Sequence, residues 1–429
     1  MKFSIITLGC KVNSYESEAI LSLLESKGWI YQNSNEVSDV YIINTCTVTS
    51  TSDQKSRQVI RSCRRKNENA VIVGMGCYTQ THPQEAIELV DVLLGTDQRN
   101  KVYDLVNEFL LNKQKINYVK DIKEIKCFEE LQLSKLTTHT RGFVKIQDGC
   151  ENFCSYCAIP FSRGKIRSRN PENVINEINQ LVNNDVKEII ISGINTGTYG
   201  QDLGYINLAK LIEKIMIETN LVRLRLSSIE LMEVSDELLD IMKKHQNRIA
   251  MHLHIPLQAG SDGVLQRMKR KYLTNDYYLL INKIRNIFPD IAVTTDCLAG
   301  FVGETEEEFN EAYEFIKKIN FADMHVFPYS RRKGTVADEM KGHLNGSVIS
   351  LRAHKLLELA EIMKNEYNHK FINTVQEVLV ERTKDDFYEG HTSNYLNVLF
   401  KSDCDVVNQI IKVKITKIEN NKIYGKEIK

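Results

Sequence analysis

Three cysteines in a C-x3-C-x2-C spacing follow the apolar run that ends at Ile146, and no other feature constrains this chain as strongly. Cys150, Cys154 and Cys157 offer three thiolates from one short loop. Three thiolates hold three irons of a 4Fe–4S cluster and leave the fourth iron open to another ligand. We therefore expect a fold that carries an iron–sulfur site on a loop directly after a strand.

Structural zinc, a disulfide pair and buried core thiols are the other interpretations of these cysteines. A structural zinc ion takes a fourth protein ligand, usually from a second C-x2-C or a His pair, and none follows Cys157. The chain has ten cysteines, its first residues do not resemble a signal peptide, and it contains no apolar run of about 18 residues that would span a membrane. These features predict a cytoplasmic protein, in which disulfides are rare.

Length and charge limit the classes of protein that need to be considered. The 429 residues predict two or three domains, and a hydrophobic content of 42% is enough to form a core in each. The formal net charge is zero, which argues against a chain that coats nucleic acid nonspecifically. Any contact with RNA would come from local patches.

The first hundred residues alternate predicted strands and helices. Extended apolar runs at 3–7, 40–43 and 71–73 end just before Cys10, Cys46 and Cys77. One helix is predicted to open at Asn13, with Glu16 three residues later as its capping partner, and another to begin at Pro83. This alternation predicts a parallel sheet, in which ligands bind beyond the carboxyl ends of the strands.

The three cysteines at those strand ends offer a second set of three thiolates. They are able to converge on a second 4Fe–4S cluster with one open iron. Small residues precede each cysteine, as any tight turn also requires. From this pattern alone, the cluster and the ordinary turn remain alternatives.

A second alternation begins near residue 141 and contains six strand candidates. A helix with one apolar face opens at Pro171. Six strands are too few for a closed eight-stranded barrel. The candidates are Phe143 to Ile146, Glu188 to Ile191, Val222 to Leu226, Ile249 to Ile255, Ile291 to Asp296 and Ala322 to Phe327.

Loops rich in glycine and hydroxyl residues follow these strand candidates. Such residues allow a ligand's ribose, carboxylate or adenine edge to approach the backbone and form hydrogen bonds. Each residue taken singly is equally compatible with a turn or a helix cap. The loops are Ser192-Gly193, Ser227 to Glu230, Pro256 to Ser261 and Gly300 to Thr305.

Positive charge is concentrated in three runs on the same rim, after the triplet, after the fourth strand and after the sixth. A single run is usually a solvated face, but three together indicate a polyanion such as RNA. Arg163 and Arg331 are alternatively candidates to hold a cofactor or cluster. The arginines predicted to contact RNA are Arg163, Arg167, Arg169, Arg267, Arg270 and Arg332.

Beyond a helical segment from about Val348 to Lys370, the chain changes to short strands with polar turns. The pattern predicts a small antiparallel barrel. Its charges are nearly balanced, so a barrel that only packs against the preceding domain is the alternative to one that binds RNA. The strand candidates are Val375 to Glu381, Tyr395 to Phe400, Ile410 to Ile418 and Lys422 to Gly425.

Taken together, these motifs resemble the methylthiotransferases, a branch of the radical S-adenosylmethionine enzymes. The resemblance rests on Leu8 to Asn13, on Asn44-Thr45-Cys46, on Gly76-Cys77 and on the triplet, and it covers nearly the whole chain. It implies an α/β protein with an amino-terminal parallel α/β sheet domain, an open six-stranded (β/α)6 barrel and a small carboxy-terminal antiparallel β-barrel, the TRAM domain. The implied domains are 1–112, a linker at 113–139, 140–368 and 369–429.

The resemblance also implies cofactors and roles for particular residues. Cys150, Cys154 and Cys157 would hold the cluster that cleaves S-adenosylmethionine to a 5′-deoxyadenosyl radical, and Cys10, Cys46 and Cys77 an auxiliary cluster that delivers sulfur. The residues expected to line the S-adenosylmethionine site are Tyr156, Gly193, Glu230 and Gln258.

By the same resemblance, the reaction replaces a C–H bond with C–S–CH3, and such a bond is too strong and too weakly acidic for acid–base chemistry alone. An outside donor, flavodoxin or ferredoxin, would supply electrons. Lys11-Val12 after Cys10, and Gly390 to Tyr395, resemble the branch acting on N6-threonylcarbamoyladenosine (t6A) at position 37 of tRNA, in the anticodon stem-loop. The alternatives are N6-isopentenyladenosine at position 37, a ribosomal-protein aspartate or, in another class, a two-cluster electron-transfer protein.

Overall fold

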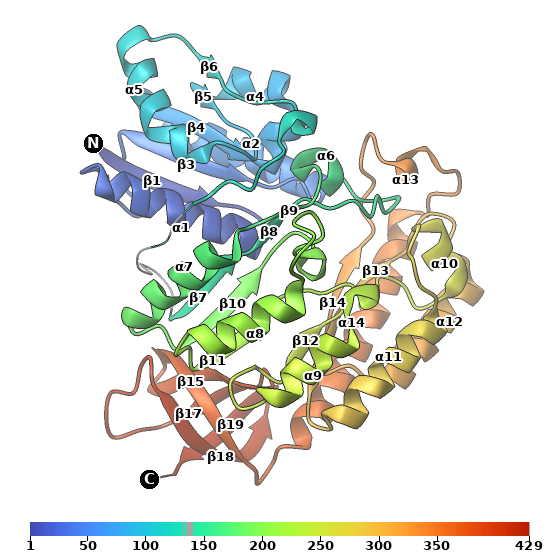
Figure 1. Cartoon of the computed structure of the whole chain (residues 1–429). Coiled ribbons are helices and arrows are strands. Elements are labelled where there is room, and N and C mark those ends of the chain that lie inside the picture. The colour runs from blue at the N-terminus through green and yellow to red at the C-terminus, as the bar shows by residue number, and fades with distance from the viewer. Residues whose placement is uncertain (132, 134–139, 429) are drawn as a thin grey trace.

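The computed structural model describes residues 1–131, 133 and 140–428, and it shows three parts stacked along the molecule (Figure 1). An amino-terminal sheet domain lies at one end, an open sheet with helices on its outer side lies in the middle, and a small closed barrel lies at the other end. The expected order of domains is therefore confirmed. Part of the predicted linker, residues 132 and 134–139, lies outside the described residues.

The amino-terminal domain is a six-stranded parallel sheet in the order β2-β1-β3-β4-β5-β6. Its last strand lies beyond residue 112, within the segment expected to be a linker. The strands are β1 (Lys2–Thr7), β2 (Ile30–Tyr31), β3 (Val40–Thr45), β4 (Val71–Gly76), β5 (Val92–Leu93) and β6 (Ile116–Asn117).

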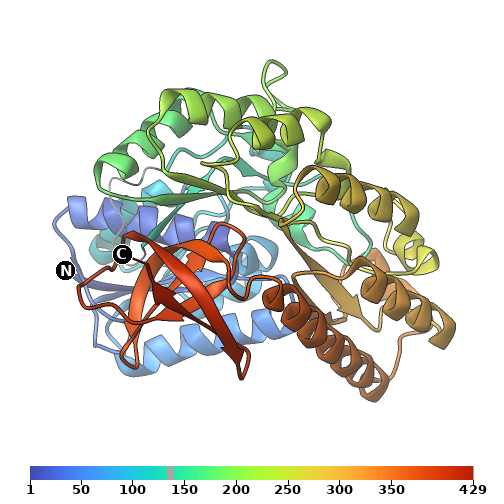
Figure 2. The same ribbon diagram turned by 90° about the horizontal axis from the view of Figure 1, so that it is seen from below.

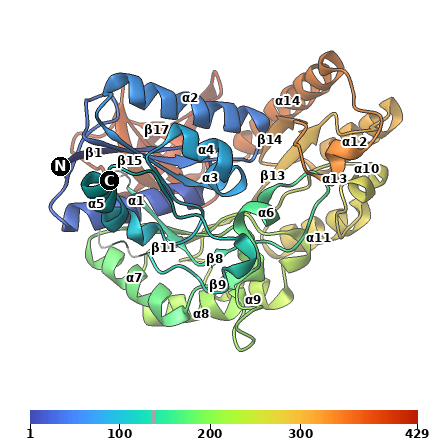
Figure 3. The same ribbon diagram turned by 90° about the horizontal axis from the view of Figure 1, so that it is seen from above.

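Helices cover both faces of this sheet because alternate side chains of its fully buried strands point to opposite sides (Figure 3). Val40 and Ile42 share a core with α1 and α5, whereas Tyr41 and Ile43 share a separate core with α2 and α4. The helices are α1 (Lys11–Ser26), α2 (Ser50–Lys66), α3 (Cys77–Thr81), α4 (Pro83–Leu89) and α5 (Val102–Asn112).

The predicted capping pair at the start of the first helix is wrong. Cys10 is the N-cap of α1, and Asn13 lies inside its first turn. The Asn13 side chain donates to the backbone oxygens of Leu8 and Thr45, at 2.7 and 3.0 Å, and thereby ties two strand ends together. Glu16 is fully buried and faces cations from other elements. The predicted start of α4 at Pro83 is confirmed.

The middle part contains all six expected strands, all parallel. They form the sheets β11-β10-β7 and β12-β13-β14, and bridges from Leu224 to Ile249 and from Ser228 to His254 connect the two. The result is an open six-stranded barrel wall. The strands are β7 (Arg141–Lys145), β10 (Glu188–Ser192), β11 (Arg223–Leu226), β12 (His252–His254), β13 (Ala292–Ala299) and β14 (Asp323–Pro328).

Helices on the outer side bury apolar faces against these strands, and the helix expected from Pro171 is among them. Asn170 caps it by accepting hydrogen bonds from the first-turn amides. The long helices are α7 (Pro171–Asn183), α8 (Leu208–Glu218), α9 (Asp236–Lys244), α11 (Thr274–Ile287), α12 (Glu306–Ile319) and α14 (Gly346–His369). The short elements are β8 (Gln147–Asp148), α6 (Ile159–Arg163), β9 (Arg167–Ser168), α10 (Asp262–Arg267), α13 (Val336–Glu339) and the 3₁₀ turns η1 (Arg99–Lys101), η2 (Ile122–Glu124), η3 (Thr196–Thr198) and η4 (Leu231–Glu233).

The carboxy-terminal part is a closed five-stranded barrel, to which α14 leads (Figure 2). The prediction of a small barrel is confirmed, with two corrections. The strand β16 was not expected, and β17 pairs with β19 in parallel, so the barrel is not wholly antiparallel. The strands are β15 (Val375–Lys384), β16 (Phe387–Thr392), β17 (Asn397–Phe400), β18 (Ile410–Glu419) and β19 (Lys422–Glu427).

Two arginines of β11 attach this barrel to the middle part. Arg225 donates to the backbone oxygens of Thr392 and Ser393, at 2.9 and 3.1 Å, and Arg223 donates to that of His391 at 3.2 Å. Glu188 of β10 accepts from both guanidinium groups. The barrel is thus held by charge-assisted hydrogen bonds from the central sheet.

Candidate active site

The cysteine triplet lies on an irregular loop between β8 and α6. Gly149 has φ +80°, and a Cβ at this position would lie 1.8 Å from the backbone oxygen of Lys165, so only glycine fits. Burial raises the pKa of Cys150 to about 11 and that of Cys157 to about 12, and the neighbouring Cys154 thiol acts in the same direction on both. The three thiols therefore share one location. A metal that binds them must displace their protons.

Arg270 connects this loop to the strand end that carries Glu230. Its Nη1 donates to Cys154 Sγ at 3.2 Å, and its Nη2 donates to the Glu230 carboxylate. The Tyr272 ring lies 5.0 Å from the guanidinium carbon. Arg270 is almost completely buried, so its hydrogen bond to the sulfur is shielded from water.

The residues expected to bind S-adenosylmethionine lie around the same loop. Burial raises the pKa of Tyr156 well above its usual value, while Arg270 acts in the opposite direction and Glu230 raises it further, so all three side chains are close together. At Gly193, a Cβ would lie 2.9 Å from Gln147 Oε1 and 3.1 Å from Gln147 Cβ, so any side chain there would displace the buried Gln147. Gln258 adopts a left-handed conformation with φ +66° and bridges to Cys297 of β13.

Two polar residues of this region were missed by the sequence analysis. Asn195 Nδ2 donates to Glu233 Oε1 at 3.0 Å, while Glu233 Oε2 is buried without a hydrogen bond among the described residues. Burial raises the pKa of Glu233 to about 7. A carboxyl that alternates between charge states near neutral pH, with one oxygen unpaired, is typical of a binding site. Only the place of Glu233 three residues beyond the Ser227 to Glu230 motif would have indicated it.

The second set of cysteines also converges. Cys10 caps α1, Cys46 follows β3, and Cys77 is the first residue of α3, so each lies at the carboxyl end of a strand, as expected. Burial raises the pKa of Cys10 and of Cys46, and Cys77 contributes to both increases. Gly9, at φ +104°, has no room for a Cβ, which would lie 2.9 Å from Cys46 Sγ. This close packing of glycine backbone against thiols fits an iron–sulfur cluster.

Arg163 makes the corresponding sulfur contact at this second set. Its Nε donates to Cys77 Sγ at 3.2 Å, and its Nη2 donates to Asn13 Oδ1 at 2.8 Å. The arginine lies in α6, six residues after Cys157, so the segment that carries the triplet reaches directly to the other cysteines. The alternative expectation, that Arg163 approaches a cluster site, agrees with this geometry.

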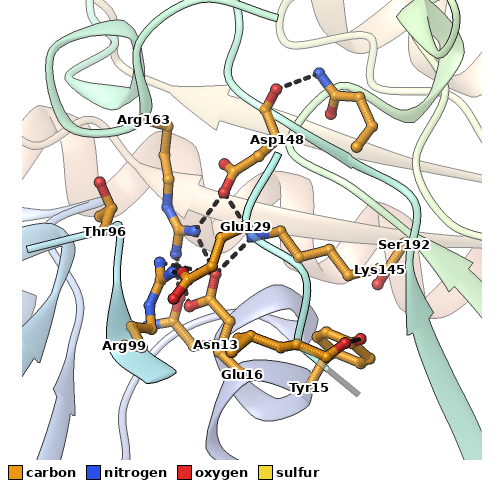
Figure 4. Close-up of polar contacts among 12 residues, drawn as sticks. Asn13, Tyr15, Glu16, Thr96, Arg99, Glu129, Lys145, Asp148, Arg163 and Ser192 are labelled. Atoms are coloured by element: carbon orange, nitrogen blue, oxygen red, sulfur yellow. Dashed lines mark hydrogen bonds and ion pairs between the residues drawn. The ribbon is translucent and has the colours of Figure 1, made fainter. Parts of the chain in front are cut away.

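A buried ion cluster holds the two domains together behind these cysteines (Figure 4). Glu16 of α1 lies 2.6 Å from Arg163 Nη1, 2.8 Å from Lys145 Nζ and 2.9 Å from Arg99 Nη2. Asp148 accepts from Lys145 and Arg163, at 2.5 and 3.2 Å. Burial alone would raise the pKa of Glu16, but Arg163, Arg99 and Lys145 outweigh it and lower the pKa to about 2. The carboxylate is therefore charged at neutral pH.

Arg163, Arg167 and Arg169 do not face a surface that RNA could contact. All three are buried. Arg169 is enclosed by Glu177 and Glu130, the latter at 2.8 Å. Because a guanidinium enclosed by protein carboxylates cannot reach a phosphate, the predicted RNA role does not fit the position of these three residues.

The other three predicted RNA-binding arginines are also engaged. Arg270 is buried as described, Arg332 pairs with Asp53 of α2 at 2.6 Å, and Arg267 alone keeps a third of its side chain exposed, beside Glu308. Arginine suits such buried pairs better than lysine does, because its planar fork binds several acceptors at once. The exposed cations of the same runs are instead Lys165, Lys269, Lys271, Arg331 and Lys333.

Comparison with known proteins agrees with this division of the chain. The family described as "Uncharacterized protein family UPF0004" matches residues 2–95, and the "Radical SAM superfamily" matches residues 144–316. These spans contain the two sets of cysteines separately.

A curated relative decides the family. "Threonylcarbamoyladenosine tRNA methylthiotransferase MtaB" of Bacillus subtilis is 44% identical over 419 residues, which cover 96% of this chain and 93% of the relative. The chain belongs to the radical S-adenosylmethionine methylthiotransferases. A "tRNA-2-methylthio-N(6)-dimethylallyladenosine synthase" of Caldicellulosiruptor saccharolyticus is also similar, at 32% identity over 99% of this chain and 92% of that one.

Solved structures support the fold of this methylthiotransferase. The radical S-adenosylmethionine methyltransferase TsrM from Kitasatospora setae aligns with a TM-score of 0.59 at 13% identity, over 79% of this chain and 75% of that chain. As a member of its family, the enzyme uses S-adenosylmethionine and two 4Fe–4S clusters. Among the described residues, no helix is both long and apolar enough to cross a membrane.

Proposed function

We propose that this methylthiotransferase converts t6A at position 37 of tRNA to its 2-methylthio derivative. The observation that carries this proposal is the 44% identity, over nearly the full length of both chains, with a relative named for threonylcarbamoyladenosine. Relatives named for dimethylallyladenosine are less similar, at 32–33% identity. The cellular site of action is proposed to be the cytoplasm, and the tRNA anticodon stem-loop is the proposed partner.

The six converging cysteines receive separate roles in this proposal. Cys150, Cys154 and Cys157 hold the cluster that serves reductive cleavage of S-adenosylmethionine, and Cys10, Cys46 and Cys77 hold the cluster that serves sulfur delivery. The bound cofactors supply the radical, the sulfur and the methyl group. An outside electron donor of the flavodoxin or ferredoxin type is part of the proposal.

The protein's own side chains orient these groups. Arg270 and Arg163 each donate to one cysteine sulfur and each pair with a glutamate, which fixes the direction of the N–H bond. Tyr156, Gly193, Glu230 and Gln258 surround the proposed S-adenosylmethionine site. Five of the six arginines that were predicted to contact RNA are enclosed by the protein. We therefore assign the proposed RNA contacts to the partly exposed Arg267 and to the exposed cations Lys165, Lys269, Lys271, Arg331 and Lys333.

Mass spectrometry of tRNA nucleosides from cells with and without the gene tests this function. Loss of 2-methylthio-t6A with accumulation of t6A is the expected result. Loss of the methylthio form of isopentenyladenosine would instead assign the enzyme to that substrate. If tRNA is unchanged and a ribosomal protein loses a methylthio group, the tRNA proposal fails.

Two cysteine variants test the division of labour in vitro. Cys150→Ala should abolish formation of 5′-deoxyadenosine from S-adenosylmethionine. Cys46→Ala should retain this cleavage but yield no methylthio product. Full product formation by Cys46→Ala would disprove the sulfur-delivery role, and an enzyme that never yields 5′-deoxyadenosine would behave as an electron-transfer protein.

A further inference from the structure

Strand β14 exposes two rings on the inner side of the open barrel wall. About two-thirds of the His325 side chain is exposed, and Phe327 is 45% exposed. Met324 and Val326, which alternate with them, pack in the hydrophobic core, and α14 contacts this strand from outside. Because successive side chains of a strand point to opposite faces, His325 and Phe327 face the interior of the barrel.

Strand β13 extends this exposed face. Its register places Asp296 beside His325 and Leu298 beside Phe327, and such neighbours in a parallel sheet share a face. Consecutive pairs on one face are two residues apart, or about 7 Å along the strands. We call this face the inner wall; it consists of Thr294, Asp296 and Leu298 of β13 and of Asp323, His325 and Phe327 of β14.

Hydrogen bonds fix the proton positions in the inner wall. His252 Nδ1 is buried and has no hydrogen-bond partner among the described residues, so it carries a lone pair rather than an N–H group, which is rarely left unpaired. His252 Nε2 therefore donates to Thr294 Oγ1 at 2.9 Å, and this hydroxyl donates to His254 Nδ1 at 2.9 Å. The proton of His254 is then on Nε2, which lies 3.3 Å from the Asp296 carboxylate.

This network orients His325. Two histidines and a carboxylate so close together are also a common metal-binding combination. A metal ion would need the lone pair of His254 Nε2, but that atom holds a proton here. Asp296 instead accepts from His254 and from His325 Nδ1, the latter at 3.2 Å. His325 Nε2 has no hydrogen bond within the part of the chain that the structure describes, so it is available to a ligand.

The carboxyl end of the inner wall lies beside Cys46. Phe327 is the penultimate residue of β14, and Arg332 follows four residues after the strand ends. Arg332 Nη2 donates to Thr47 Oγ1 at 2.6 Å. Thr47 directly follows Cys46, so the chain just beyond Phe327 is attached to the loop that carries this cysteine.

The amino end of the inner wall borders a cavity of about 380 Å³. Thr294 and Asp323 line it on the side of the wall, and Phe387 and Tyr395 line it on the side of the carboxy-terminal barrel. A cavity of this size is typical of ligand pockets. The inner wall therefore connects Cys46 with a hollow of ligand size.

An exposed aromatic ring on such a wall suits an unstacked base. A base that is to be modified must leave its stack, and proteins hold such bases on aromatic side chains. We infer that the target nucleoside lies on the inner wall, with its base stacked on Phe327 and its N6 substituent hydrogen-bonded to His325 Nε2. This inference rests on the proposed function.

The chemistry of t6A fits both contacts. Position 2 and N6 belong to the same edge of adenine, so a base that turns position 2 toward Cys46 keeps its N6 substituent at the inner wall. The threonylcarbamoyl group carries N–H groups, a hydroxyl and a carboxylate. An imidazole nitrogen accepts from the N–H or hydroxyl groups when it is neutral and donates to the carboxylate when it is protonated. A dimethylallyl group offers none of these partners.

Two synthetic anticodon stem-loops test these contacts, one with t6A and one with unmodified adenosine at position 37. Affinities are measured by fluorescence anisotropy at one salt concentration. Phe327→Ala should weaken binding of both stem-loops by about 5- to 100-fold, as expected for the loss of one stacked base, whereas Phe327→Tyr should bind both as wild type does. His325→Phe keeps a ring but loses the nitrogen, so it should weaken only the t6A stem-loop, by about 10-fold.

Controls separate these contacts from effects on folding or on the clusters. Iron and sulfide content, and formation of 5′-deoxyadenosine without RNA, should match wild type in every variant. Loss of either in Phe327→Ala would show a structural role and refute the stacking. Tyr205→Ala removes another exposed aromatic ring, in the segment before α8, and should bind both stem-loops as wild type does.

The outcomes distinguish this inference from the proposed function. If wild-type enzyme modifies t6A but Phe327→Ala binds both stem-loops normally, the function stands and the stacking is refuted. If His325→Phe weakens both stem-loops equally, or neither, the contact with the N6 substituent is refuted. If wild-type enzyme does not modify t6A, the function fails. The affinities then test the inference separately, since equal affinity of wild type for the two stem-loops would refute the N6 contact.

Discussion

Replacing Glu16 by glutamine should destabilise the contact between the amino-terminal and central domains. The substitution keeps the shape of the side chain but removes the charge that faces Arg99, Lys145 and Arg163. In the folded protein the pKa of Glu16 is lowered from 4.5 to about 2. A shift of this size corresponds to about 3 kcal/mol at neutral pH. Removing one partner of a buried ion pair typically costs about 3–5 kcal/mol, which agrees.

Thermal unfolding of the cluster-loaded enzyme measures this loss. With about 2.1 cal/mol/K of unfolding entropy per residue, 1 kcal/mol lowers the melting temperature of a 429-residue chain by about 1 °C, so Glu16→Gln should melt about 3 °C below wild type. The matched control is Glu25→Gln on the same helix, where the exposed carboxylate has no ion pair among the described residues, and it should stay within about 0.5 kcal/mol of wild type. If Glu16→Gln melts with the control, the three cations do not depend on Glu16.

Three further measurements test other parts of the structure. Because the Glu16 carboxyl is more acidic in the folded than in the unfolded chain, its contribution to stability is complete above pH about 4.5 and declines as the pH falls toward 2. The stability difference between wild type and Glu16→Gln should therefore shrink by about 1 kcal/mol at pH 4. A difference that stays constant with pH would contradict the assignment. Arg270→Lys keeps the charge but loses the planar guanidinium that reaches Cys154 and Glu230 together. The reduction potential of the cluster on Cys150, Cys154 and Cys157 should therefore fall, as measured by redox titration followed by electron paramagnetic resonance. An unchanged potential would show that the N–H···S contact has no effect. Glu188→Gln leaves Arg223 and Arg225 without their carboxylate and should weaken attachment of the carboxy-terminal barrel. The variant should therefore have a lower melting temperature and bind tRNA more weakly. Wild-type values for both measurements would refute this role.

The strands and cysteine positions could be predicted because their signals are local. A parallel strand that is buried on both faces forms a short continuous apolar run, and each cysteine follows its strand within a few positions, so the pattern at Val71 to Cys77 contains the information needed. The same reasoning failed for β16. Its Gly390 and His391 lie among polar residues, and the tight turn to β15 is made by Asp385 and Asp386, both at positive φ, without the glycine that usually marks such a turn in a sequence.

The ion cluster and the arginines could not be predicted, because their partners are remote in the sequence. Asn13 and Glu16 have the spacing of a capping pair, but Glu16 faces Arg163, which is 147 residues away. A run of basic residues gives no indication of which members lie inside the protein. Apart from the exposed Arg331 and the partly exposed Arg267, the arginines of these runs are buried, whereas the lysines are exposed, in keeping with the weaker hydration and planar donor geometry of arginine.

The two sets of cysteines share one arrangement that links their chemistry to the fold. At each set, an arginine donates to one sulfur at 3.2 Å and is held by a glutamate: Arg163 by Glu16 at Cys77, and Arg270 by Glu230 at Cys154. The surroundings differ, however, because Glu16 is completely buried, whereas nearly a quarter of the Glu230 side chain is exposed. The arginine at Cys77 is therefore fixed by the domain contact itself, while the arginine at Cys154 is held by a carboxylate that a bound ligand can reach. On this basis a ligand at the strand ends can alter the hydrogen bond to Cys154 without disturbing the one to Cys77.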